Sequence, residues 1–332
     1  MGLPYPSRRH TSFKPYQPTH RDYFRFGAQR GDEVLGGPTR FVPLELISHY
    51  HIAMQPLAGI KVVSTAFNMP GPAAAWQLHG FGASLVKVEP PGGDPLKRNC
   101  PELYEEFTAG QQVVELNLKQ EADRARMGEL LAEADVLLTS TLPASLERLG
   151  LDWERLHAEH PRLCQVAIVG YAPPKQEVTG HDLTYQASVG LVSPPTMPST
   201  LLADMAGAQT AVTHVMGVLH ERTRTGDGVL SYVPIAGAVD FFAIPLKYQI
   251  TIPGGRLGGS LPMYNLYPAR EGWVAVAALE PHFWEKMRQL LELKEGTYAE
   301  LKRIFAHRSA REWERWAVEN RLPVAEVQPP VE

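Results

Sequence analysis

From Ile60 onward, short apolar runs alternate with segments whose apolar residues recur at helical spacing. Runs such as IKVVS and SLVKV are typical of buried strands in a parallel sheet, which are covered on both faces. The alternation therefore predicts an α/β fold. The expected strands are 60–64, 84–88, 136–138 and 163–169; the expected helices are 73–80, 121–134, 153–159, 183–190 and 200–224; a proline–glycine loop is expected at 70–72.

Four strands separated by helices predict an open, doubly wound parallel sheet with Rossmann-like connectivity. A dinucleotide site does not follow from that fold, because the first strand-to-helix turn, NMPGP at 68–72, lacks the G-x-G-x-x-G fingerprint. The chain also lacks the G-x-x-x-x-G-K-[ST] motif of P-loop proteins. We therefore expect no nicotinamide cofactor and no nucleotide hydrolysis.

Composition narrows the class of protein further. With 332 residues, 44% hydrophobic and 20% charged, the chain is typical of a globular protein of about two domains. Its only cysteines, Cys100 and Cys164, provide no disulfide framework or cysteine zinc cluster. Asp204, Gln209 and His214 interrupt its most apolar helical segment, so no membrane span is expected. The start has no apolar signal core, and we expect a cytoplasmic location.

Residues 1–55 form a region of their own, with seven basic and four acidic residues and therefore a charge of about +3. Aromatic residues such as Tyr16, Tyr23 and Phe26 are interleaved with the cations, as in segments that hold a single nucleic-acid strand. The alternative is an arm that packs on its own protein or on a second subunit. The whole chain carries a net charge of −4, and we favour the arm and expect no nucleic-acid partner.

Three ionisable residues stand at the ends of predicted elements. Asp204 falls near the start of the helix 200–224, where a carboxylate either caps the helix or meets a ligand at its positive end. His181 precedes a short helix, either as a capping or surface residue or as an acid/base group, because imidazole titrates near neutrality. Glu280 ends the apolar run 273–279, where it could orient a histidine or be solvated.

Other chemistries find little support in the sequence. His157 and His160 are three residues apart on a predicted helix, but no third metal ligand accompanies them, and we expect no metal site. No G-x-S-x-G turn presents a serine nucleophile.

Ten short motifs, in order and at similar spacing, resemble the family III CoA-transferases and, among them, the α-methylacyl-CoA racemases. The resemblance covers about residues 57–327, most of the chain. The motifs are PLAGIKVV (56–63), GASLVKVEPPGGDP (82–95), VVELNLK (113–119), ADVLL (134–138), LERLGL (146–151), HPRL (160–163), GHDLTYQA (180–187), LLADMAG (201–207), ERTRTGDG (221–228) and ALEPHFW (278–284).

The resemblance implies a Rossmann-like, CoA-binding large domain at 56–235, a smaller α+β domain with a shortened C-terminus at 236–332, and an interlocked homodimer. Its active sites would lie between the subunits. In the racemases the catalytic histidine and aspartate match His181 and Asp204, and a supporting glutamate matches Glu280. Lys119, which follows a strand expected at VVELNL (113–118), and Arg148 match positions near the CoA phosphates. Lys87 is a third expected CoA-binding residue.

Two reactions share these residues, because the transferases use the aspartate at the position of Asp204 as the nucleophile that attacks the thioester. His181 and Glu280 favour the racemase-like reaction, proton transfer at the α-carbon of a 2-methylacyl-CoA. A CoA-transferase acting on a free carboxylic acid is the alternative, with Gly254, Gly255, Gly258 and Gly259 as a counterpart of its glycine loop.

Departures from the family keep a third reading open, that of a catalytically idle CoA-binding or scaffold protein. An Arg-Pro-Gly turn common in the family is replaced by Leu-Pro-Ala at 142–144. Family members also continue for several dozen residues past the position of Glu332. We expect residues 1–55 to pack where that tail lies in relatives, or to clasp the partner subunit.

Overall fold

The larger of two β-sheets is parallel and has six strands in the order β3-β2-β1-β4-β5-β6. This order confirms the predicted doubly wound α/β class. The structure, a computed structural model, describes residues 55–329; the extension predicted at 1–55 therefore lies, except for Gln55, outside the described residues. The strands are β1 (Lys61–Ser64), β2 (Ser84–Glu89), β3 (Gln112–Glu115), β4 (Val136–Thr139), β5 (Cys164–Val169) and β6 (Leu230–Pro234).

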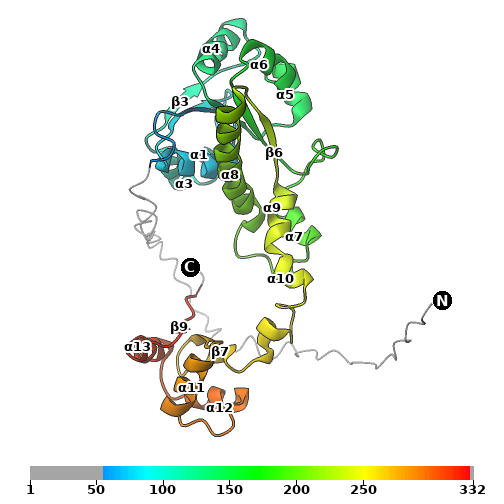
Figure 1. Cartoon of the computed structure of the whole chain (residues 1–332). Helices are drawn as coiled ribbons and strands as arrows, with labels where there is room; N and C mark the ends of the chain where they lie inside the picture. Colours follow the sequence, from blue (N-terminus) through cyan, green and yellow to red (C-terminus); the bar gives the residue numbers. More distant parts are fainter. Residues whose placement is uncertain (1–54, 330–332) are drawn as a thin grey trace, which may run out of the picture. The chain divides into compact units, whose positions relative to one another are not determined.

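Helices cover both faces of this sheet. Side chains alternate between the two faces along each strand, so an apolar strand places apolar side chains on both faces. Val62 and Leu138 point into a core with α1 and α8, whereas Val63 and Leu137 point into a second core with α4, α5 and α6. Figure 1 shows α8 beside β6 and α4 to α6 grouped together. The helices are α1 (Pro70–Gly80), α2 (Pro95–Asn99), α3 (Pro101–Thr108), α4 (Glu121–Ala132), α5 (Pro143–Leu149), α6 (Trp153–Glu159), α7 (Asp182–Ser188), α8 (Leu202–Thr225), α9 (Ile235–Phe242) and α10 (Ile244–Lys247).

Differences from the predicted elements have local causes. Strand β3 confirms the strand expected at 113–118, although it ends at Glu115. Strand β6 was not expected; it is a sheet edge, and its partial exposure removes the continuous apolar run that marks a central strand. The loop expected at 70–72 is instead the first turn of α1, where proline is tolerated because the early N–H groups have no helical partner.

The smaller sheet is antiparallel and has its own core, as expected for an α+β unit. Aromatic rings fill that core: Phe305 lies 5.1 Å from Tyr267 and 5.0 Å from Trp313, measured between ring centroids. An irregular turn, Arg256–Ser260, precedes it. Its elements are β7 (Tyr264–Pro268), β8 (Trp273–Ala277), α11 (Pro281–Leu290), α12 (Tyr298–Phe305), α13 (Ala310–Asn320) and β9 (Val324–Glu326).

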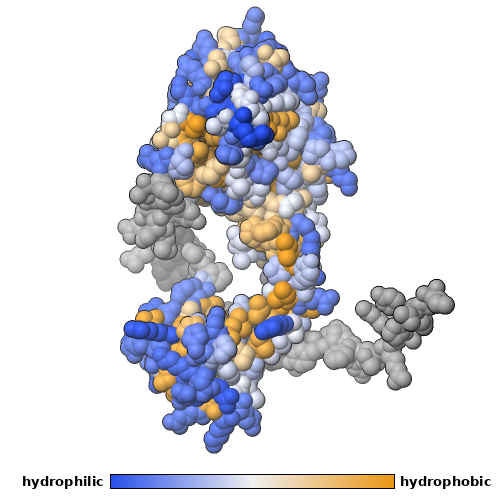
Figure 2. Space-filling view, in the orientation of Figure 1, coloured by the Kyte–Doolittle hydropathy of each residue, from blue (hydrophilic) through white to orange (hydrophobic). Residues whose placement is uncertain are grey.

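The connection between the two sheets is unusually apolar at its surface. Phe241, Phe242 and Ile244 on α9 and α10 are 69%, 49% and 41% exposed, and Figure 2 shows an apolar patch over this segment. Val239, also on α9, is buried in the first core, four residues beyond the predicted domain boundary. Among the helices of residues 55–329, none has the length and apolar character needed to cross a membrane.

Candidate active site

A cavity of about 220 Å³ lies at the carboxyl ends of the central strands. The loops that follow β1 and β4 form two of its walls, and these strands are neighbours from which the chain winds in opposite directions. That switch point is where open α/β sheets bind ligands. The lining residues are Phe67, Asn68, Pro70, Ser140, Leu142, Ile168, Val169, Gly170, Val178, Thr179, Gly180, His181, Tyr185, Asp204 and Ile235.

His181 lines this cavity and is the residue that directly precedes α7. Its backbone is fixed by the helix it begins: the His181 N–H donates to the Thr184 hydroxyl at 3.1 Å, and its carbonyl accepts the Thr184 N–H at 2.8 Å. The residue is exposed. Its backbone position is therefore set by α7 while the imidazole can reach a ligand in the cavity.

Helix α8 is capped by a residue other than the one expected. It begins at Leu202, so Asp204 lies within its first turn and not at the cap. The N–H groups of Ala203 and Asp204 donate to the Asp182 carboxylate, at 2.8 and 3.1 Å. Because Asp182 satisfies two of the unpaired helix donors, the Asp204 carboxylate is released from capping.

The Asp204 carboxylate is half-buried in the same cavity and forms no hydrogen bond with another described residue. Burial raises its pKa to about 6, the Asp182 charge adds to the increase, and His181 opposes it. A carboxylate of this basicity can both accept and return a proton near neutral pH. His181 and Asp204 thus line one cavity.

Tyr185 is a cavity residue that the sequence analysis missed, since one tyrosine within a short helix is typical of core packing. It is buried, and its pKa is raised to about 12 by burial, by Tyr171 and by Asp204. A Cβ atom at Gly170 or Gly180 would come within 2.4 or 2.6 Å of the Tyr185 ring or hydroxyl. The usable signal was the glycine five positions before the tyrosine in GHDLTY.

A second cavity, of about 390 Å³, lies at the ends of β1, β2 and β3 and shares Phe67 with the first. Lys119 lines it, as do Asn117 and Thr65. Arg148 does not line it but lies on α5 between lining residues; it is exposed, and its guanidinium donates to Ser145 Oγ at 2.6 Å.

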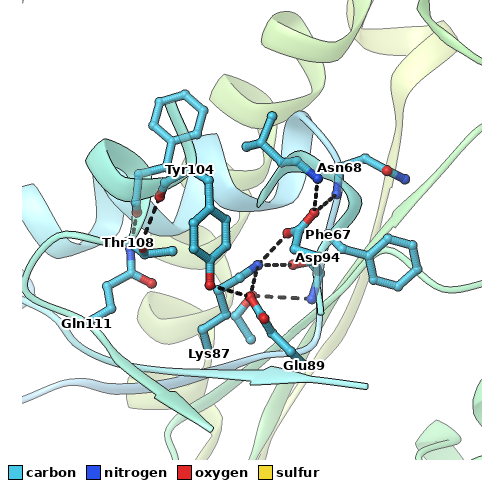
Figure 3. A network of polar contacts seen from close by, with 12 residues as sticks. Phe67, Asn68, Lys87, Glu89, Asp94, Tyr104, Thr108 and Gln111 are labelled. Atoms are coloured by element: carbon cyan, nitrogen blue, oxygen red, sulfur yellow. Dashed lines mark hydrogen bonds and ion pairs between the residues drawn. The ribbon is translucent and has the colours of Figure 1, made fainter. Parts of the chain in front are cut away.

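Lys87 occupies a different environment from the other two expected CoA-binding residues. It is 2% exposed, and its ammonium contacts three partners: Asp94 at 2.6 Å, Glu89 at 3.6 Å and the Ala66 carbonyl at 3.3 Å (Figure 3). Two of these contacts are hydrogen bonds, to Asp94 and to the Ala66 carbonyl, and the contact with Glu89 is an ion pair. The structure thus gives Lys87 an internal role, whereas its expected contact with CoA stays a prediction.

The Lys87 network holds the loop that separates the two cavities. Asp94 also accepts the Asn68 N–H at 3.1 Å, while Lys87 binds the Ala66 carbonyl, so Phe67 is fixed from both sides (Figure 3). The Tyr104 hydroxyl donates to Glu89 at 2.8 Å and ties α3 to the same group. Asn68 has a φ of 64°, a left-handed conformation that asparagine tolerates better than most residues.

Glu280 is not brought together with His181 and Asp204 in the cavity. It precedes α11 beside the antiparallel sheet, is exposed, and makes no capping hydrogen bond through its side chain. Among residues 55–329, no group of three or more histidine, cysteine, aspartate or glutamate side chains is arranged to hold a metal ion.

Comparison with known proteins identifies the family. The sequence profile described as CoA-transferase family III matches residues 57–332. The chain belongs to this family. It is 31% identical to human alpha-methylacyl-CoA racemase over 288 residues, which cover 77% of this chain and 74% of the racemase. It is also 26% identical to the succinyl-CoA:mesaconate CoA-transferase of Haloarcula marismortui, over 72% of this chain and 68% of that protein.

Solved structures share the fold of this family III chain. A hypothetical protein from Mycobacterium tuberculosis superimposes with a TM-score of 0.69 at 23% identity, over 83% of this chain and 84% of the other. A CaiB/BaiF family protein from Brucella suis gives a TM-score of 0.69 at 22% identity, over 83% and 85% of the two chains. The relatives of known sequence include both a racemase and a CoA-transferase, so membership of the family does not by itself identify the reaction.

Proposed function

We propose that this family III protein transfers the α-proton of a 2-methylacyl-CoA thioester, as a racemase does. The observation that carries the proposal is that His181 and Asp204 line one cavity while the Asp204 carboxylate forms no hydrogen bond within residues 55–329. Two acid/base groups at one carbon are what inversion requires, because the proton leaves one face and another arrives at the opposite face. The human racemase relative supports this choice.

In the proposed reaction, one member of the pair takes the α-proton and leaves an enolate conjugated with the thioester carbonyl. The other member delivers its own proton to the opposite face, so the C–H bond is remade with inverted configuration and the thioester stays intact. The next turnover in the reverse direction exchanges the two roles. Asp204, with a pKa of about 6, suits both roles because its two protonation states lie close in free energy near neutrality.

The enolate oxygen needs N–H donors. The N-terminal end of a long helix is a common source of such donors, but few are available in the first turn of α8. The N–H groups of Ala203 and Asp204 are already occupied by the Asp182 carboxylate. The N-terminal end of α7 directly follows His181, which lines the cavity, and is our proposed source of positive potential for the oxyanion.

The second cavity is our proposed site for the nucleotide part of CoA. Its position at the ends of β1 to β3, with Lys119 in its wall and Arg148 on the neighbouring helix, suits a polyphosphorylated ligand. Phe67 lines both cavities, so the pantetheine arm would pass this ring to place the thioester beside His181 and Asp204.

The proposal is tested by incubating the protein with a 2-methylacyl-CoA in deuterium oxide and following the α-position by NMR. We expect deuterium to enter the α-carbon, and Asp204→Ala and His181→Ala each to lower the rate at least 100-fold. Arg126→Ala, on the exposed face of α4, serves as the control and should exchange at the wild-type rate. Absence of exchange in the wild-type protein would reject the racemase-like reaction.

CoA transfer is the alternative, since an unpaired Asp204 carboxylate could also attack a thioester and several relatives are transferases. The glycines at 254–259 do not by themselves favour it. A Cβ at Gly258 would lie 1.8 Å from the Ile252 carbonyl oxygen, so backbone packing alone explains that glycine. Transfer of CoA to a free acid, with release of the donor acid and without α-exchange, would support the transferase. Neither reaction, with CoA still bound, would support an idle CoA-binding protein.

A homodimer completes the proposed site. Glu280 does not line the His181 cavity, and the apolar residues of α9 and α10 are exposed, which is typical of a surface covered by a partner. We propose that Glu280 of one subunit supports His181 of the other.

A further inference from the structure

We propose that Asp182 is a positioning residue whose carboxylate fastens the helix end that follows His181 to the helix end that carries Asp204. The inference rests on the proposed proton transfer by that pair. Asp182 is the first residue of α7, directly after His181, and it is only 5% exposed. The sequence alone does not indicate a role for this aspartate. In the structure its carboxylate accepts hydrogen bonds from Ala203, Asp204 and Gln186.

Both carboxylate oxygens of Asp182 are occupied by donors from separate segments. One oxygen accepts the N–H groups of Ala203 and Asp204, in the first turn of α8. The other accepts the side-chain amide of Gln186 at 2.6 Å. Gln186 is itself 3% exposed and donates to the Thr200 carbonyl at 3.1 Å, just before α8. The brace therefore joins α7 to the entry and to the first turn of α8.

This brace matters because the two proton-transfer groups belong to different helices. Helix α7 has seven residues and follows a long irregular segment, 170–181, so its own backbone gives His181 little support relative to α8. A displacement of about 1 Å between reacting groups can slow a reaction about 100-fold. A buried, charge-assisted set of hydrogen bonds fixes such a separation better than apolar packing, because it is directional.

The same carboxylate also adds, after burial, to the raised pKa of Asp204. The titratable groups that face Asp204 are Asp182 and Tyr185, both on α7, and His181, which precedes that helix. The other elements packed around α8 present apolar side chains to the cavity: Pro70 from α1, Ile168 and Val169 from β5, and Ile235 from α9. Removing the Asp182 charge is therefore expected to lower the pKa of Asp204.

Two substitutions separate the brace from the charge. Asp182→Asn keeps an oxygen that accepts the two α8 amides but removes the charge, whereas Asp182→Ala removes both. We expect Asp182→Asn to shift the acidic limb of the exchange rate to lower pH by about 0.5 to 1 unit, with the plateau rate within about threefold of wild type. We expect Asp182→Ala to lower the plateau rate about 100-fold or more. Asp152→Asn, which alters the cap of the distant helix α6, is the matched control and should change neither.

Two further measurements do not depend on any reaction. The Asp204 carboxyl carbon is titrated by ¹³C NMR, with Asp204→Asn for assignment, and amide hydrogen exchange is followed at Ala203 and Asp204. Support is a lower Asp204 pKa in Asp182→Asn, with amide protection retained there and lost in Asp182→Ala. An unchanged carboxyl pKa with unchanged amide protection in both variants would overturn the proposal, even if the wild-type protein proves inactive toward 2-methylacyl-CoA.

Discussion

At the scale of single residues, the charged form of Asp204 is destabilised by burial and by the nearby Asp182 charge. Asp204 is half-buried without a hydrogen-bond partner among residues 55–329, and its carboxylate lies near the Asp182 charge. Its pKa is about 6 in the folded protein against an ordinary value of 3.8. Between these two pH values the folded state binds the proton more tightly than the unfolded state, so stability falls as the pH rises through this window.

Asp204→Asn should therefore stabilise the protein at neutral pH while abolishing activity. We expect the free energy of unfolding to rise by about 1 to 2 kcal/mol above pH 6, less than a full conversion of the pKa shift because the side chain is only half-buried. Below about pH 4 the gain should vanish, since the wild-type carboxyl is then neutral as well. Urea unfolding at pH 4, 5, 6 and 7.5 measures this dependence.

Asp227→Asn, in the exposed turn after α8, is the control for that series and should change the free energy of unfolding by less than about 0.5 kcal/mol at every pH. A loss of stability for Asp204→Asn at pH 7.5 would show that the carboxylate makes a net favourable interaction and would contradict the argument.

At the scale of elements, the loop between β1 and α1 is held by buried charge. The ammonium of Lys87 faces two carboxylates, and this group anchors the loop on either side of Phe67. Removing one partner of a buried ion pair costs more than the pair contributes, because the remaining charge is left without compensation. The network therefore restrains the wall that separates the two cavities.

Lys87→Met should lower the free energy of unfolding by about 3 to 5 kcal/mol. The control is Lys61→Met, since Lys61 pairs with Glu133 at 2.9 Å but both side chains are exposed, 55% and 73%. That change should cost less than about 1 kcal/mol. Denaturant unfolding at pH 7 compares the two, and equal losses would show that the Lys87 group is not an electrostatic anchor.

At the scale of the whole molecule, we propose that Glu280 of one subunit supports His181 of the other. His181→Ala and Glu280→Gln should each inactivate the protein as homodimers. Co-expression of the two variants with different tags gives mixed dimers in which one site contains both substitutions and the other contains neither. We expect the purified mixed dimer to recover about half of the wild-type exchange rate per dimer.

If Glu280 acts within its own subunit, both sites of the mixed dimer carry a substitution and no activity returns. Pairing His181→Ala with Asp204→Ala provides the control, because both residues line the same cavity of one chain. Under either arrangement of Glu280, that mixed dimer has one substitution in each site and should stay inactive.

The sequence determined the fold class and the chemical types at the site. Apolar runs define the central strands because those strands are buried on both faces, and this predicted β1, β2, β4 and β5. The edge strand β6 was missed because a half-exposed strand lacks that signal, whereas the other edge strand, β3, was expected at 113–118. His181 and Asp204 were found through motifs and ordinary acid/base chemistry, and the structure does bring both to one cavity.

Only the tertiary structure decided what surrounds those residues. The sequence could not show that Asp182 caps α8 in place of Asp204, because the two residues are 22 positions apart and meet only when α7 packs on α8. It could not distinguish the buried Lys87 from the cavity-lining Lys119, since burial depends on distant segments folding over a side chain. Local pattern fixes what an element is, whereas charge, capping and access depend on contacts that the chain makes only after it has folded.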